Sequence, residues 1–293
     1  MILYYALGGG LGHLTRARAV VHTLGLTGPI VLLTASPYAA DPRVTAGMQV
    51  IPVPPALERD RHAYRAWLQR LITQVTPDAI YLDAFPAGIQ GELCGELLPP
   101  DRPVYHLARR LRWPHYACAL QDTPPALTMT YQLEPLDPAH AAFLQDHSRA
   151  VVPLALVDPP APPPTPAITR LRTPDRPLWL IAHAGAEDET AELLAYAELL
   201  ARQMQVQPQL LLVTPQRPAG LPAHVLHLAY YPASALFPLA DAIITGGGFN
   251  TMRQAAPYAH KHHALPFPRH FDDQFARVAR QRANQFAPGR PAQ

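Results

Sequence analysis

Short apolar runs alternate with helical patterns in the first half of the chain. Residues 61–75 place Tyr64, Leu68, Leu71 and Ile72 at helical spacing, so one face of a helix is apolar. A second helix is predicted over residues 14–24. Apolar runs typical of buried strands cover residues 2–7, 30–34, 49–53, 79–83, 104–107 and 128–133. This alternation favours a parallel sheet with crossover helices.

A proline-rich run at residues 159–177 interrupts the pattern, because proline fits neither a helix interior nor an inner strand. The alternation then restarts. Strands are predicted over residues 178–182, 209–213, 224–228, 241–245 and 262–266, and helices over 187–204, 251–258 and 272–285. We therefore predict an α/β protein with two Rossmann-like domains, over residues 1–157 and 178–293, joined by a linker at 158–177, with a ligand in the cleft between their sheets.

Composition excludes several classes of protein. The 293 residues contain 24 Lys and Arg against 22 Asp and Glu, and this balance argues against a strongly basic nucleic-acid binder. Lys261 is the only lysine, so neither a P-loop nor a Schiff-base lysine is present elsewhere. No run approaches the ~20 apolar residues of a spanning helix, and no basic segment precedes the apolar N-terminus. We expect a cytoplasmic protein. Peripheral contact with the inner membrane face stays open as an alternative.

The first glycine-rich turn follows the first predicted strand and contains Gly10, Gly12, His13 and Arg16. Glycines before a helix start form an anion site, and we assign this loop to phosphate or acceptor binding. The dinucleotide spacing G-x-G-x-x-G fails at His13. A helix N-terminus favours neutral imidazole, so His13 is a candidate base. Asp83 ends a central strand and is its candidate partner. The alternatives are a packing histidine and an ordinary turn carboxylate.

A second glycine-rich turn, Gly246–Gly248, leads into Asn250 and Thr251, which we predict to cap a helix. Its backbone N–H groups are suited to a diphosphate. The acidic run 187–189 at another helix start is interpreted as neutralisation of the helix dipole. The alternative is that the glycines only pack helix on strand. Asp273 and Gln274 suit sugar hydroxyls. The alternative is that Asp272 and Asp273 form an ordinary helix N-cap.

These motifs together carry a resemblance. Gly10-x-Gly12-His13 resembles the N-terminal motif of GT-B glycosyltransferases of the MurG type, glycosyltransferase family 28. Residues 240–251 are similar to the family's A-D-x-x-I-x-x-x-G-x-x-T stretch, and the segment from Pro266 to Gln274 resembles its V-P-x-P … D-Q loop. The resemblance spans both halves of the chain. It implies the GT-B fold, with the acceptor mainly on the N-terminal domain and the nucleotide sugar mainly on the C-terminal one.

The resemblance also implies roles for individual residues. His13 matches the family's active-site histidine, and Tyr230 lies in the stretch that precedes the base-binding position. Gln254 stands where the family has a glutamate that binds the ribose, which weakens that contact. The remaining expected donor-binding residues are Gly246, Gly247, Gly248, Asn250, Thr251, Asp273 and Gln274.

The expected reaction is metal-independent, inverting transfer of a sugar from a nucleoside diphosphate, with UDP-sugar as the expected donor, to an acceptor hydroxyl. The acceptor is a small molecule, a glycan or a lipid-linked molecule. No cofactor and no metal is expected, since adjacent residues of the His260–His263 run would point to opposite faces of a strand. Two alternatives stay open: a nucleotide-sugar hydrolase of the PseG type, which shares the Gly10–Arg16 pattern, and a non-catalytic nucleotide-sugar-binding protein.

Overall fold

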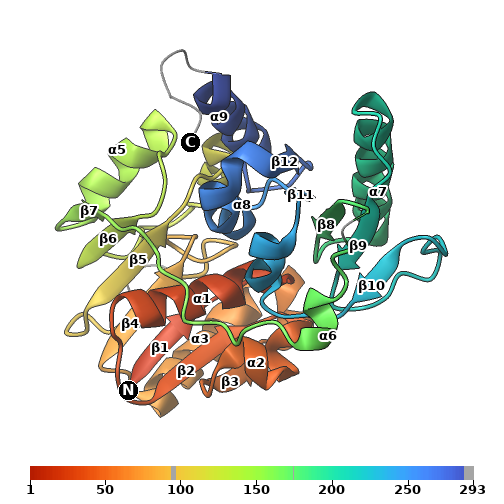
Figure 1. Ribbon diagram of the computed structural model, residues 1–293. Helices are drawn as coiled ribbons and strands as arrows, with labels where there is room; N and C mark the ends of the chain where they lie inside the picture. The colour runs from red at the N-terminus through yellow and green to blue at the C-terminus, as the bar shows by residue number, and fades with distance from the viewer. Residues whose placement is uncertain (94–96, 174, 287–293) are drawn as a thin grey trace. The chain divides into compact units, whose positions relative to one another are not determined.

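The chain forms two compact units in the computed structural model, which describes residues 1–93, 97–173 and 175–286 (Figure 1). The first unit comprises Met1–Pro159 together with His270–Asp272, and the second comprises Pro160–Arg269 and the chain from Asp273 onward. The division falls within the predicted linker. The short return of His270–Asp272 to the first unit was not foreseen.

The first unit is built on a seven-stranded sheet in the order β3-β2-β1-β4-β5-β6-β7, and all the neighbouring strands are parallel. The strands are β1 (Ile2–Tyr5), β2 (Ile30–Thr34), β3 (Gln49–Pro52), β4 (Ala79–Asp83), β5 (Val104–Ala108), β6 (Met129–Gln132) and β7 (Val151–Pro153). The α-helices are α1 (Leu11–Thr23), α2 (Pro42–Thr45), α3 (Arg61–Val75), α4 (Trp113–Ala117) and α5 (Pro138–His147), with 3₁₀ turns η1 (Pro37–Ala40) and η2 (Pro55–Arg59).

The helix α3 shows why this unit folds as its sequence predicts. Asp60 caps the N-terminus, because its side chain accepts a hydrogen bond from the Ala63 N–H at 2.9 Å. The apolar stripe that includes Tyr64 and Leu68 is buried against the sheet. Thr76 ends the helix in the left-handed conformation. Burial of this stripe with β1, β2 and β4 makes the main core of the first unit.

The second unit holds a five-stranded parallel sheet in the order β10-β9-β8-β11-β12. The strands are β8 (Leu178–Ala182), β9 (Gln209–Val213), β10 (Leu226–Leu228), β11 (Ala242–Gly246) and β12 (His262–Leu265). The helices are α6 (Pro166–Thr169), α7 (Glu187–Gln203), α8 (Phe249–Ala255) and α9 (Gln274–Phe286), with 3₁₀ segments η3 (Ala233–Leu239) and η4 (Ala256–Lys261). Two fully buried strands, β8 and β11, lie side by side at its centre.

Several predicted boundaries were wrong. The helix expected at residues 251–258 ends as α8 at Ala255 and continues as η4, because Pro257 offers no N–H to an α-helical ladder. The linker prediction 158–177 includes α6, and Ile168 and Leu171 from this segment pack against the core of the second unit. Among the described residues, no helix is both long enough and apolar enough to cross a bilayer.

Both sheets reverse their direction of growth at the same topological place. The first three strands of each unit extend the sheet one way, and the fourth strand pairs with the other edge of the first. The switch point therefore lies between β1 and β4 in the first unit and between β8 and β11 in the second. Ligands of open α/β sheets bind outside the carboxyl ends of the strands at such a point. The two switch points are the places to examine for function.

Candidate active site

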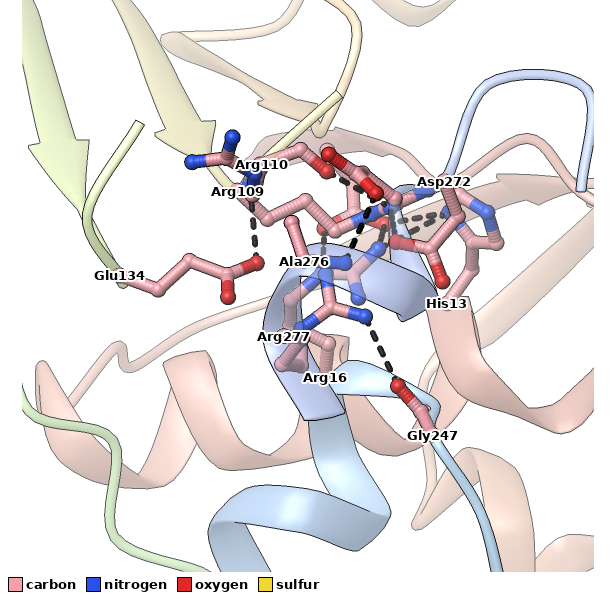
Figure 2. A network of polar contacts seen from close by, with 11 residues as sticks. His13, Arg16, Arg109, Arg110, Glu134, Gly247, Asp272, Ala276 and Arg277 are labelled. Atoms are coloured by element: carbon pink, nitrogen blue, oxygen red, sulfur yellow. Dashed lines mark hydrogen bonds and ion pairs between the residues drawn. The ribbon is translucent and has the colours of Figure 1, made fainter. Parts of the chain in front are cut away.

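His13 lies at the switch point of the first unit, in the first turn of α1 (Figure 2). The helix starts at Leu11, earlier than predicted, after Gly10 as the N-cap residue. Nδ1 of His13 lies 2.5 Å from Oδ2 of Asp83, which ends β4. The structure thus brings together the two residues that the sequence analysis paired, from the two strands that flank the switch point.

Arg16 forms an ion pair with Asp83. Its guanidinium grips the Asp83 carboxylate with two bonds, Nε to Oδ1 at 2.5 Å and Nη2 to Oδ2 at 2.6 Å. Both side chains are buried, at 3 % and 0 % exposed. Since Arg16 stands one helical turn after His13, both reach the same carboxylate. Arg16 therefore neutralises and positions Asp83, and its contact with phosphate or acceptor stays a prediction.

The charge state of this cluster follows from its surroundings. Burial raises the pKa of Asp83, but Arg16 and His13 outweigh burial and hold that pKa well below its usual range. Burial lowers the pKa of His13, and the opposing pull of Asp83 does not restore it. His13 is therefore neutral at pH 7. Because the carboxylate of Asp83 can only accept, it selects the tautomer with hydrogen on Nδ1 and leaves a lone pair on Nε2.

Gly8 makes room for the imidazole, a function that the sequence analysis missed. A Cβ atom on Gly8 would stand 2.2 Å from Cδ2 and 2.4 Å from Nε2 of His13, far inside normal contact. Gly8 also has φ of +153°, where a side chain is strained. A Cβ atom on Gly10, by contrast, would meet no atom within 4 Å. The signal in the sequence was the first glycine after β1, whereas the sequence analysis assigns a role only to Gly10 and Gly12.

Segment His270–Asp272 packs onto the first unit beside this cluster. Asp272 accepts a hydrogen bond from the Arg109 guanidinium at 2.5 Å (Figure 2). The Arg112 N–H donates to the Phe271 carbonyl at 2.7 Å. The Phe271 ring packs edge-on against Phe85, and the Phe85 ring also stacks with His13. Asp272 is therefore not part of α9, which begins at Gln274 and not at residue 272 as predicted.

The glycine turn of the second unit follows β11. Here α8 begins at Phe249 with Gly248 as N-cap and no side-chain cap, so the prediction that Asn250 and Thr251 cap the helix was wrong. Gly247 is needed for packing, because a Cβ there would stand 2.6 Å from Cγ2 of Val278 in α9. Its carbonyl accepts a hydrogen bond from Arg277 Nη1 at 2.9 Å (Figure 2). These contacts give Gly247 the structural role that we had weighed as the alternative.

Other predicted donor residues also have identifiable contacts. The Asp273 side chain caps α9 by accepting from the Ala276 N–H at 3.1 Å. Gln274 is buried, and its Oε1 accepts from the Phe267 N–H at 3.0 Å. Tyr230 is half-buried against the core of the second unit, and Gln254 is half-buried on α8. The structure places these residues in the second unit without assigning them a ligand.

A histidine-carboxylate pair also occupies the second switch point. His183 directly follows β8, and its Nε2 lies 2.8 Å from Oε2 of Glu189 in α7. Glu189 is also held by the Arg269 guanidinium, from Nη2 at 2.6 Å. Glu189 in the acidic run at the start of α7 therefore contacts two side chains. The sequence analysis interprets this run only as neutralisation of the helix dipole. The sequence separation of 80 residues between Glu189 and Arg269 hid this cluster.

The comparisons with known proteins bear on the fold. No family model matches the sequence, and no curated protein does. Among solved structures, the chain is similar to the glycosyltransferase SnogD from Streptomyces nogalater, at 17 % identity and a TM-score of 0.56 over 97 % of this chain and 88 % of that one. It is similar to the spinosyn forosaminyltransferase SpnP, at 15 % identity and a TM-score of 0.61 over 98 % and 83 %.

A third similar structure is the spinosyn rhamnosyltransferase SpnG complexed with thymidine diphosphate. Its identity is 19 % and its TM-score 0.60, over 97 % of this chain and 84 % of that one. At such identities the likeness shows the fold alone. The chain has the GT-B fold of these glycosyltransferases, as predicted.

Proposed function

We propose that this protein is a glycosyltransferase that moves a sugar from a nucleoside diphosphate to an acceptor hydroxyl. The observation that carries the proposal is the His13–Asp83 pair at the first switch point, where a buried carboxylate fixes the tautomer of a neutral histidine. The fold shared with sugar transferases supports it. In this proposal the first unit takes the acceptor and the second unit takes the donor.

The proposed reaction is a single displacement. The acceptor oxygen attacks the anomeric carbon while its proton passes to the lone pair on Nε2 of His13. The bond between the anomeric carbon and the phosphate oxygen breaks, and the electron pair leaves on the nucleoside diphosphate. One displacement inverts the configuration at that carbon. Asp83 stabilises the imidazolium that forms, and Arg16 keeps Asp83 ionised.

The donor is expected to be a pyrimidine nucleotide sugar. The MurG-type resemblance favours uridine, and the thymidine diphosphate in SpnG makes thymidine the other choice. We propose that the turn Gly246–Gly248 with Thr251 holds the diphosphate, so that transfer needs no metal. Asp273 and Gln274 would contact the sugar, Tyr230 would lie by the base, and Gln254 would bond a ribose hydroxyl as an amide.

The test begins with calorimetric titration of the protein with UDP, dTDP, GDP and their sugar conjugates, without added metal. Saturable binding of one of them defines the donor for a screen of acceptors. His13→Ala is then expected to abolish transfer while donor affinity stays within about twofold, since the base acts on the acceptor. His22→Ala is the matched control, an exposed histidine on the same helix. Wild-type turnover in His13→Ala would refute the assignment.

Hydrolysis is the second candidate. In the pattern Gly10-x-Gly12-His13-x-x-Arg16, which resembles the PseG type, Arg16 and His13 contact the same carboxylate. Water would replace the acceptor and give its proton to His13. Release of free sugar from the donor in the absence of any acceptor, at the rate seen with one, would favour hydrolysis over transfer. Donor binding without any turnover would leave a nucleotide-sugar-binding protein.

A further inference from the structure

His183 occupies the position in the second sheet that a ligand of an open α/β sheet would approach. It follows β8, and Gly246 ends β11 on the other side of the switch point. Nδ1 of His183 lies 3.4 Å from where a Cβ atom on Gly246 would stand. The imidazole and the glycine turn are therefore neighbours at the carboxyl edge of the sheet, where they line one site.

Glu189 fixes the orientation of this imidazole. Its carboxylate accepts from Nε2–H of His183 at 2.8 Å, so Nδ1 carries the lone pair while the ring is neutral. A Cβ atom on Gly185 would stand 2.4 Å from Nε2 of His183 and 2.5 Å from Oε2 of Glu189, between the two partners. The turn after β8 thus accommodates the pair only because residue 185 is a glycine.

Without a ligand, His183 is uncharged at neutral pH. Burial lowers its pKa, and Glu189 and Asp188 from α7 oppose burial while Arg269 adds to it. Arg269 also neutralises Glu189, which weakens the stabilisation that this hydrogen-bonded carboxylate would give an imidazolium. From β11, Thr245 and Gly246 bring no titratable group. A fixed negative charge at the glycine turn would reverse this balance and favour protonation.

We propose that His183 binds the diphosphate of the donor and takes up a proton as the nucleotide sugar arrives. This inference rests on the proposed function. The proton comes from the solvent and bonds to the lone pair of Nδ1, and the new N–H then donates to a phosphate oxygen. Nε2–H stays on Glu189, which acts as a positioning residue. Both nitrogens of the imidazolium are then donors to anionic oxygens.

Calorimetry measures the proton directly. The nucleotide sugar that binds is titrated at pH 7.5 in two buffers of different ionisation enthalpy, PIPES and Tris, and the difference in observed heat gives the protons taken up. A nucleotide sugar is chosen because its diphosphate does not itself titrate near neutral pH. We expect uptake of about 0.5 to 1 proton, with Kd rising by up to about tenfold per pH unit above pH 7.5.

Three variants identify the group. His183→Gln is expected to abolish uptake and to weaken binding about tenfold at pH 6.5, with little effect at pH 8.5. Glu189→Gln keeps a hydrogen-bonding group but removes the charge, and is expected to reduce uptake. His224→Gln is the matched control, because His224 forms another histidine-glutamate pair in this unit, with Glu198 at 3.2 Å, and is 62 % exposed. It is expected to leave uptake unchanged.

The outcomes separate this inference from the proposed function. If no nucleotide or nucleotide sugar binds the wild-type protein, the proposed function fails and the inference falls with it. Binding of the wild-type protein with no proton uptake overturns the inference alone. Equal proton uptake in folded His183→Gln and in the wild type would overturn the inference, because the proton would then bind another group. If His183→Gln does not fold, undiminished proton uptake in Glu189→Gln would overturn it instead.

Discussion

The substitution Gly8→Ala should displace the imidazole of His13, the proposed base, while His13 itself stays unchanged in sequence. The new methyl carbon would stand 2.2 Å from Cδ2 of His13, whereas ordinary contact begins at 3.4 Å, so the ring must move by about 1.2 Å. Asp83 holds the ring from its other side through Nδ1, so this movement breaks or stretches that hydrogen bond. A displacement of about 1 Å in a catalytic group costs roughly 100-fold in rate. The φ of +153° adds a strain of about 1–3 kcal/mol.

The assay is sugar transfer under saturating donor and acceptor, with donor affinity measured separately by calorimetry. We expect kcat to fall roughly 100-fold in Gly8→Ala while donor Kd is unchanged, because the donor is proposed to bind the second unit. Gly9→Ala is the control from the same turn, since a Cβ there meets nothing within 4 Å. It should keep kcat within about threefold. A Gly8→Ala enzyme as fast as Gly9→Ala would refute the steric argument.

Two further predictions concern stability. Asp83→Asn leaves the Arg16 cation buried without its carboxylate, and should lower the free energy of unfolding by about 3–5 kcal/mol in urea at pH 7; an unchanged midpoint would contradict the role given to Arg16. Burial lowers the pKa of His140 to about 3, so the unfolded chain binds a proton there below its pKa of 6.5 and stability falls as the pH drops. Between pH 7 and pH 5, the free energy of unfolding of His140→Leu should therefore fall by about 2 kcal/mol less than that of the wild type. Equal falls in the two proteins would show that His140 does not titrate in this range on unfolding.

The strands with continuous apolar runs were predictable, and the short elements near prolines were not. β2 and β8 match their predicted bounds because each is a five-residue apolar run directly after a proline. The helix α5 was missed although its start carries a clear signal: Asp137 caps it by accepting from the Ala139 N–H at 3.0 Å, and Pro138 occupies the first turn. Its weakly periodic apolar residues concealed it.

Contacts at the candidate site were predictable only where topology or helix spacing determined them. His13 and Asp83 were paired because Asp83 ends a central strand of the sheet whose first strand leads into the His13 turn. Arg16 was within reach of the same reasoning, since positions three apart share a helix face, but its cation suggested phosphate instead. The Arg269–Glu189 ion pair could not be foreseen, because it depends on how the loop after β12 folds back over α7.

The two triple-glycine turns, Gly8–Gly10 and Gly246–Gly248, occupy different topological positions in their sheets. Gly8–Gly10 follows the first strand of its unit, whereas Gly246–Gly248 follows the fourth strand of the other. By order in the sheet, β1 corresponds to β8 and β4 to β11. The topological counterpart of the turn before His13 is therefore the turn that carries His183, and the counterpart of Asp83 is the end of β11. At each switch point, one histidine follows the first strand and contacts a carboxylate. The carboxylate of Asp83 comes from the neighbouring strand, whereas that of Glu189 comes from the following helix. The glycine turn of the second unit then occupies the place that Asp83 fills in the first, which leaves room there for an anion rather than supplying one.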